Sequence, residues 1–156
     1  MKIEHVAIWV KDIDKVCEFY RKYFGGVVQP IYHNPAKQFT SRFVTFESGA
    51  RLEVMHRPDI EIETGMFHME RLQTEDASTN SFVDISEVQQ VGSKGAQHLG
   101  FTHLSFSVGS KEDVDRLTRQ MSEDGIQVVG QPRTTGDGYY ESVVLDPEGN
   151  RVEITI

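Results

Sequence analysis

Residues 3–10 show the first clear pattern in this chain, an alternation of apolar and polar positions that predicts a strand with one buried face. From residue 13 to residue 24 the apolar spacing becomes that of a helix, which Asp12 can cap and Gly25 can end. In the strand, the face expected to be buried carries Val6, Ile8 and Val10, and the other face carries Ile3, His5, Ala7 and Trp9.

Further along, the pattern predicts two strands near residues 38–47 and 51–55, joined by a turn at 48–50. The second half of the chain repeats this plan with a strand over residues 101–108. A helix follows from Ser110, which forms a capping box with the acidic residue three positions on, and ends near Gly125. The remaining strands are expected near residues 127–129, 140–145 and 151–156, with the last turn at 146–150.

The two halves also share sequence. The phrase at residues 48–53 (Ser-Gly-Ala-Arg-Leu-Glu) recurs at 148–153 (Glu-Gly-Asn-Arg-Val-Glu), 100 positions later. The chain therefore predicts an α+β fold made of two tandem βαβββ units that form a curved mixed sheet around a cleft. We expect a single domain in which residues 1–57 and 100–156 are the two units.

Residues 58–99 have no counterpart in the repeat and are acidic and weakly patterned. A short helix is expected over residues 66–72. A connection of this length is uncommon in a compact domain unless it has a function, so a surface insertion, a lid and a dimer arm all remain open.

Composition narrows the functional classes. With 156 residues, 38% of them hydrophobic, the chain is long enough for one packed core. A net charge of −8 without a basic run argues against a nucleic-acid partner. The single Cys17 excludes an intrachain disulfide and fits a reducing compartment. With no apolar leader and no run long enough to span a bilayer, the sequence predicts a cytoplasmic protein without a membrane partner.

Four residues are candidate metal ligands. His5 and Glu53 each point away from the apolar face of their own strand, and His103 and Glu153 do the same in the second half. Imidazole and carboxylate together suit a borderline divalent ion such as Ni, Zn, Mn, Co or Fe. Any one of these residues, taken alone, is more often an ordinary polar side chain than a metal ligand. The recurrence of the His and Glu positions in both halves of the chain favours a metal centre. The other histidines lack a partner in the repeat and are expected on the surface or in loops: His33, His56, His68 and His98.

These features resemble the vicinal oxygen chelate superfamily, which includes glyoxalase I, fosfomycin-resistance proteins, bleomycin-binding proteins, extradiol dioxygenases and methylmalonyl-CoA epimerase. Residues 19–25 (Phe-Tyr-Arg-Lys-Tyr-Phe-Gly) are similar to the end of the family's first helix, and residues 146–153 are similar to its last hairpin. The set of two histidines and two glutamates looks like that of glyoxalase I and nearby lyases or isomerases. Dioxygenases and fosfomycin-resistance enzymes usually keep three protein ligands, and bleomycin-binding proteins generally lack the set.

The resemblance implies an enzyme that removes a proton next to a carbonyl, with His5 and His103 as permanent ligands. Either Glu53 or Glu153 would be the general base, and the resemblance favours Glu153. Glyoxalase I typically carries an arginine for glutathione four residues after the first histidine, where this chain has Trp9. We therefore expect an activity that is not strictly glutathione-dependent.

Other substrate contacts are less specific. Trp9 could stack on a substrate or simply pack in the wall. Four residues near the last hairpin could line the pocket or lie on the surface: Arg133, Tyr139, Tyr140 and Glu141. The alternative function is a non-catalytic protein that binds a small molecule, such as a drug or antibiotic, in the same cleft. The resemblance also implies a homodimer, and in some family members the metal lies between units from different chains.

Overall fold

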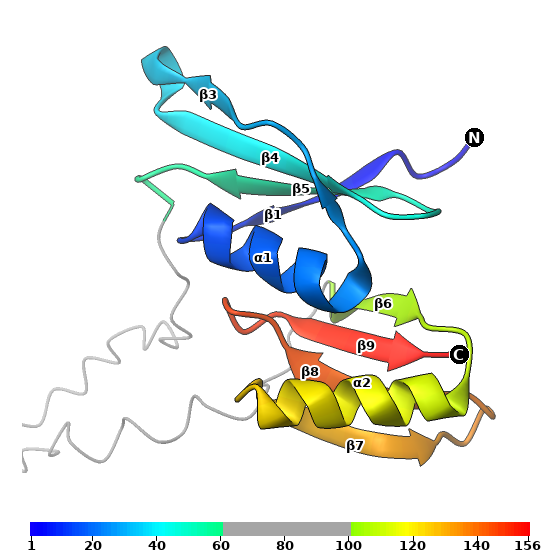
Figure 1. The fold of residues 1–156 in the computed structure, drawn as a ribbon. Coiled ribbons are helices and arrows are strands. Elements are labelled where there is room, and N and C mark those ends of the chain that lie inside the picture. Colours follow the sequence, from blue (N-terminus) through cyan, green and yellow to red (C-terminus); the bar gives the residue numbers. More distant parts are fainter. Residues whose placement is uncertain (61–100) are drawn as a thin grey trace, which may run out of the picture.

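The computed structural model describes residues 1–60 and 101–156, which form two units of the same plan (Figure 1). The first unit consists of β1 (His5–Trp9), α1 (Ile13–Phe24), β2 (Val27–Val28), β3 (Tyr32–Asn34), a 3-10 turn (Pro35–Lys37), β4 (Phe39–Thr45) and β5 (Arg51–His56). The second consists of β6 (His103–Ser107), α2 (Lys111–Glu123), β7 (Val128–Thr134), β8 (Tyr140–Leu145) and β9 (Arg151–Thr155).

Both sheets have the same strand order. The first runs β1-β5-β4-β2, and β3 also pairs with β4. The second runs β6-β9-β8-β7. In each sheet the first strand is parallel to the last, so that His5 pairs with Arg51 and His103 pairs with Arg151. The other pairs are antiparallel. The α+β fold of two tandem βαβββ units is confirmed, although the curved sheet is not closed.

The two helices begin and end where the sequence places their signals. The Asp12 carboxylate accepts a hydrogen bond from the Lys15 amide at 3.0 Å, and the Ser110 hydroxyl accepts one from the Asp113 amide at 3.1 Å. Gly25 ends α1 in the left-handed conformation, with φ of 64°, which costs glycine little. Capping thus fixes the start of both helices and the end of the first.

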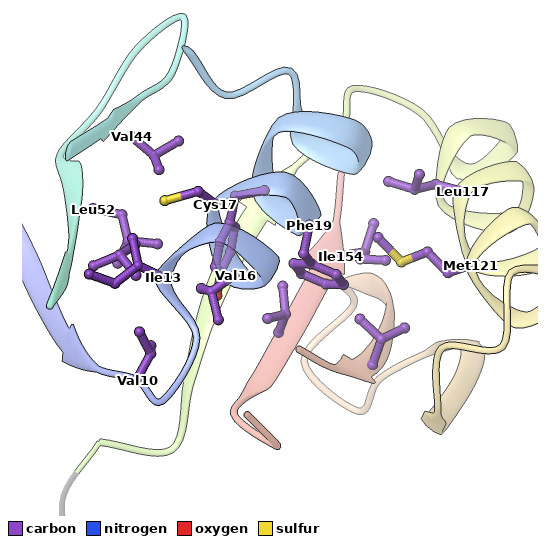
Figure 2. Packing of buried hydrophobic residues seen from close by; sticks show 14 of the residues in the cluster. Val10, Ile13, Val16, Cys17, Phe19, Val44, Leu52, Leu117, Met121 and Ile154 are labelled. Atoms are coloured by element: carbon purple, nitrogen blue, oxygen red, sulfur yellow. The ribbon is translucent and has the colours of Figure 1, made fainter. Parts of the chain in front are cut away.

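Helix α1 lies between the two sheets and joins the units through one core (Figures 1 and 2). Its Val16 and Tyr20 are fully buried, and its Phe24 stacks on Phe106 of β6 with ring centroids 4.3 Å apart. Because α1 covers one face of the first sheet, the opposite face of that sheet is turned away from the second unit. This arrangement decides where the candidate ligands can meet.

Polar contacts reinforce the junction between the units. The Tyr20 hydroxyl donates to the Asp146 carboxylate at 3.3 Å. The Glu148 carboxylate accepts from the Lys11 and Asp12 amides at 2.9 and 3.1 Å, just before α1 begins. A carboxylate at this position accepts hydrogen bonds from backbone amides that have no partner within the helix. Its negative charge also interacts favourably with the positive N-terminal end of the helix dipole. The last hairpin therefore also anchors the first helix.

Some elements differ from the sequence prediction. The short strands β2 and β3 were not individually expected, because two or three residues are too few to show an alternation. Strand β7 extends to Thr134, beyond the expected end at 129, and its pairing with β8 shifts register around Gly130. Such irregularities break the period of two that reveals a strand. The helix expected at 66–72 and most of the expected insertion at 58–99 lie outside the described residues. None of the helices that the structure describes is long and apolar enough to cross a membrane.

Candidate metal centre

The open face of the first sheet brings His5 and Glu53 together. The two residues lie on neighbouring strands β1 and β5, and Nε2 of His5 is 3.7 Å from Oε2 of Glu53. The Glu53 side chain is 17% exposed and that of His5 is 41% exposed, so the pair sits in the surface of the sheet with one open side. The Phe43 ring on β4 meets the His5 ring edge to face, with centroids 5.6 Å apart.

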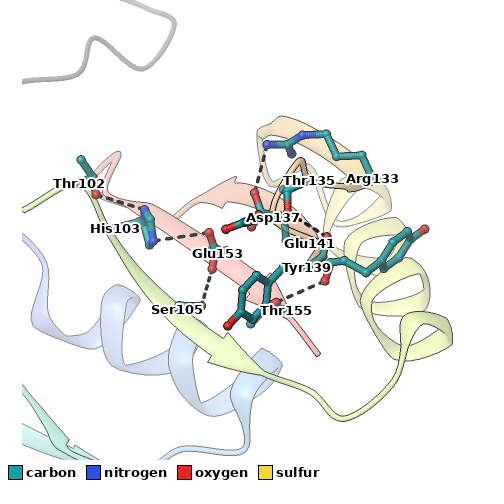
Figure 3. Close-up of polar contacts among 11 residues, drawn as sticks. Thr102, His103, Ser105, Arg133, Thr135, Asp137, Tyr139, Glu141, Glu153 and Thr155 are labelled. Atoms are coloured by element: carbon teal, nitrogen blue, oxygen red, sulfur yellow. Dashed lines mark hydrogen bonds and ion pairs between the residues drawn. The ribbon is translucent and has the colours of Figure 1, made fainter.

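The second sheet repeats this pair with a richer set of polar neighbours (Figure 3). Nε2 of His103 lies 3.4 Å from Oε2 of Glu153, and the Ser105 hydroxyl donates to Oε1 of Glu153 at 2.6 Å. Burial and the neighbouring Glu153 carboxylate raise the pKa of Glu141 above its usual value. Arg133 donates to Glu141 at 3.1 Å. Carboxylates and hydroxyls thus cluster around this His–Glu pair.

In both pairs the second ring nitrogen of the histidine has a partner next to it in sequence. Nδ1 of His5 lies 2.5 Å from the Glu4 carboxylate, which also accepts a hydrogen bond from Arg51. Nδ1 of His103 lies 3.2 Å from the Thr102 hydroxyl. Metal-binding histidines usually make such a contact through the nitrogen that does not bind the metal, which orients the ring. Nε2 therefore faces the glutamate in both units.

The donor atoms suit a shared divalent ion. With metal–ligand distances of ~2.0–2.2 Å, two donors on one ion lie about 2.8–3.6 Å apart at octahedral to tetrahedral angles. The observed separation of 3.4 Å lies in that range, and that of 3.7 Å comes within a small side-chain movement of it. One imidazole and one carboxylate from each unit would make a set of two nitrogens and two oxygens, which suits the borderline metals.

The four predicted ligands lie on two separate sheets (Figure 1). Each pair sits on the face of its sheet that no helix of its own unit covers. Within residues 1–60 and 101–156 of a single chain, no three metal-binding side chains are gathered in one place. One chain therefore presents two half-sites.

The structure also places the other sequence-predicted residues. Trp9, Arg133 and Tyr139 lie on or at the border of the open faces, with Trp9 41% and Tyr139 56% exposed. Tyr140 belongs to the opposite face, where its hydroxyl donates to Asp115 of α2 at 2.7 Å, so we leave it out of the site. His56, at the end of β5, is partly buried and donates from Nδ1 to the carbonyl of Val10, the residue after β1, at 3.0 Å.

His33 lies 2.9 Å from the Thr40 hydroxyl on an exposed edge, as a surface residue would. His68 and His98 lie outside the described residues. Two further residues around the pairs, Glu4 and Ser105, were not proposed as functional from sequence, whereas Glu141 was among the possible pocket residues. The alternation of β6 already put Ser105 on the face of His103, but its contact with Glu153 depends on the register between β6 and β9.

Comparisons with known proteins agree with the fold. A family model described as Glyoxalase/Bleomycin resistance protein/Dioxygenase superfamily matches residues 2–154. Among solved structures, a glyoxalase family protein from Enterococcus faecalis is similar with a TM-score of 0.63 and 21% identity, over 99% of this chain and 97% of that one. No curated protein matches the chain significantly in sequence.

Two structures of glyoxalase I are also similar. The enzyme from Leishmania major, described as trypanothione-dependent, has a TM-score of 0.61 and 16% identity, over 99% of this chain and 86% of that one. Glyoxalase I from Zea mays has a TM-score of 0.61 and 15% identity, and the match covers 99% of this chain but 44% of the maize chain. This chain thus spans less than half the length of the maize enzyme, and these identities support a shared fold.

Proposed function

Because the chain belongs to the Glyoxalase/Bleomycin resistance protein/Dioxygenase superfamily, we propose that it is a metal-dependent lyase or isomerase of the glyoxalase I type. Its substrate is a small molecule with two neighbouring oxygens, and it removes a proton from the carbon next to a carbonyl. The observation that carries this proposal is the repeated pair, in which a histidine Nε2 faces a glutamate carboxylate in both units.

The complete centre, in this proposal, forms between two chains of a homodimer. The open face of the first sheet lies on the side away from α1, whereas the second unit packs on the α1 side, so the two half-sites of one chain stay apart. A twofold axis can place the first sheet of one chain opposite the second sheet of its partner, which creates two equal sites. Each site would then hold His5 and Glu53 from one chain and His103 and Glu153 from the other.

A divalent ion bound there would act as a Lewis acid that stabilises negative charge on the substrate oxygens. The protein supplies the proton acceptor. We assign this role to Glu153, because the Ser105 hydroxyl holds its Oε1 and keeps the carboxylate oriented when the other oxygen turns toward the substrate. Glu53, which has Ala7 in place of that serine, is the alternative base.

Substrate contacts come from the same faces. Trp9 offers a flat indole where glyoxalase I has an arginine, so it cannot form the bidentate pair that holds a glutathione carboxylate. Arg133 and Tyr139 flank the second pair and supply polar groups (Figure 3). This arrangement supports an activity that is not strictly glutathione-dependent.

Metal analysis of the purified protein, combined with assays on hemithioacetals of methylglyoxal with several thiols, tests the proposal. We expect near-stoichiometric Ni, Zn, Mn, Co or Fe, and turnover that does not require glutathione. The double variant His5→Ala/Glu153→Ala should lose both, while Glu18→Gln, which changes an exposed carboxylate on α1, should keep both. Metal-free protein whose small-molecule binding ignores the double variant would instead identify a non-catalytic binding protein.

A further inference from the structure

The two open faces can be compared position by position, because their strands pair in the same register. Each face has a row with the histidine, a second row with the glutamate, and a third row about 7 Å further along the strands. In the first sheet the third row contains Trp9, Met55, Ser41 and Tyr32. In the second sheet it contains Ser107, Thr155, Glu141 and Arg133. The His–Glu pairs are the same in the two units, whereas the third rows have become apolar in one and polar in the other.

Two aromatic residues of the apolar row, together with Phe39 two positions before Ser41 on β4, form a group that we call the aromatic wall and define as Trp9, Tyr32 and Phe39. Trp9 and Phe39 meet edge to face with centroids 6.0 Å apart, and Tyr32 and Phe39 lie 6.2 Å apart. Trp9 is 41% and Tyr32 is 56% exposed, so the aromatic wall leaves ring surface open to a ligand. The Arg57 guanidinium lies over the Trp9 ring at 5.5 Å and holds the indole in place.

The polar row of the other unit has little apolar surface. Glu141 is 14% exposed and is bound by Arg133, and the threonine and serine of the row offer hydroxyls. Three arginines lie on the open faces by their strand pairing: Arg51, Arg151 and Arg133. Arg51 is engaged by Glu4 and Arg133 by Glu141, whereas Arg151, in the row of His103, makes no ion pair with the described residues. The third rows therefore offer no free cation to the carboxylates of a peptide thiol such as glutathione.

We infer that the substrate is an aryl-substituted α-hydroxy carbonyl compound, in which the carbon next to the carbonyl carries the proton that is removed. Its two oxygens lie at the His–Glu pairs, its ring stacks on the aromatic wall of one chain, and its remaining polar groups face the polar row of the partner. This inference rests on the proposed function, because only a site built from one unit of each kind places an apolar and a polar wall around the same ligand set.

Two hydroxamates provide the test, one with a phenyl ring and one with a methyl group in its place. Benzohydroxamate and acetohydroxamate both chelate through two oxygens, so titration of the Zn²⁺-loaded protein with each isolates the contribution of the ring. We expect benzohydroxamate to bind at least about tenfold more tightly. Trp9 is the one tryptophan of the sequence, so its fluorescence should respond to benzohydroxamate directly.

Substitutions test whether the aromatic wall causes the preference for benzohydroxamate. Phe39→Ala should reduce the benzohydroxamate preference to about threefold or less while leaving acetohydroxamate binding and Zn²⁺ content unchanged. Val27→Ala, which shortens an exposed apolar side chain on the outer strand β2, should leave the preference unchanged. Equal affinities for the two hydroxamates in protein that holds Zn²⁺ would overturn the inference and leave the proposed function standing. Protein that binds neither Zn²⁺ nor a hydroxamate would overturn both.

Discussion

The carboxylate of Glu4 lies 2.5 Å from Nδ1 of His5. The hydrogen bond with His5, together with that from Arg51, holds the pKa of Glu4 below its usual value, so Glu4 is ionised at neutral pH and can only accept. Nδ1 of His5 therefore carries the hydrogen, and Nε2 presents its lone pair toward Glu53. A carboxylate behind a metal-binding imidazole fixes the tautomer and increases the basicity of the ligand.

Replacing Glu4 by glutamine should weaken metal binding about tenfold, because the orientation and polarisation of the His5 ring would be lost. Metal affinity measured by competition with a chromophoric chelator would check this. The control is Glu18→Gln, which removes the charge of an exposed glutamate on α1. This variant should leave the metal affinity unchanged. An equal loss in both variants would mean that Glu4 acts only through net charge.

The serine beside Glu153 offers a second test. In Ser105→Ala the Glu153 carboxylate loses its 2.6 Å hydrogen bond, and we expect kcat to fall about tenfold with metal content unchanged. The matched change is Ala7→Ser, which adds a hydroxyl at the equivalent position beside Glu53. If Glu53 were the base, Ser105→Ala would leave kcat nearly unchanged and Ala7→Ser would alter it.

The junction between the units should contribute strongly to stability. Phe106 stacks on Phe24 and contacts Tyr20 and Phe46, so Phe106→Ala should lower the free energy of unfolding by about 2–4 kcal/mol. Urea unfolding followed by circular dichroism measures this, and Phe101→Ala, at a fully exposed position, should cost less than about 0.5 kcal/mol. A loss confined to one of two separate transitions would show that the units unfold independently.

Cys17 should be inert in the folded protein. It is 2% exposed, and burial raises the pKa of its thiol to about 11, so the reactive thiolate is scarce at pH 8. We expect a thiol reagent to label it at pH 8 only when urea unfolds the chain. Rapid labelling of native protein would contradict the packing of α1 between the sheets.

Much of the fold could be predicted from local signals. Alternation placed His5 and His103 on the faces that their helices do not cover, and caps such as Asp12 and Ser110 fixed where the helices begin. Repetition then indicated that both halves share one βαβββ plan, whereas the order of the strands in each sheet comes from the structure. These features depend on residues close together in sequence, whose periodicity and turn chemistry carry the information.

The rest depends on contacts between distant residues. The bond between Ser105 and Glu153 requires the register of two strands that are far apart in the chain, and alternation alone could not assign Tyr140 to Asp115. The packing of Phe24 on Phe106 decides which side of the first sheet faces the second unit. No local pattern encodes that choice, and it is the choice that keeps the two half-sites of one chain apart.

A complementation experiment tests the central claim, a metal centre shared between two chains, most directly. One variant, His5→Ala/Glu53→Ala, lacks the first half-site, and another, His103→Ala/Glu153→Ala, lacks the second. Each alone should hold almost no metal. Mixing them under conditions that exchange subunits should restore about a quarter of the wild-type metal and activity, because half of the randomly formed dimers carry one intact site of two. If the mixture holds no more metal than the separate variants, the centre is not shared between chains and the account is contradicted.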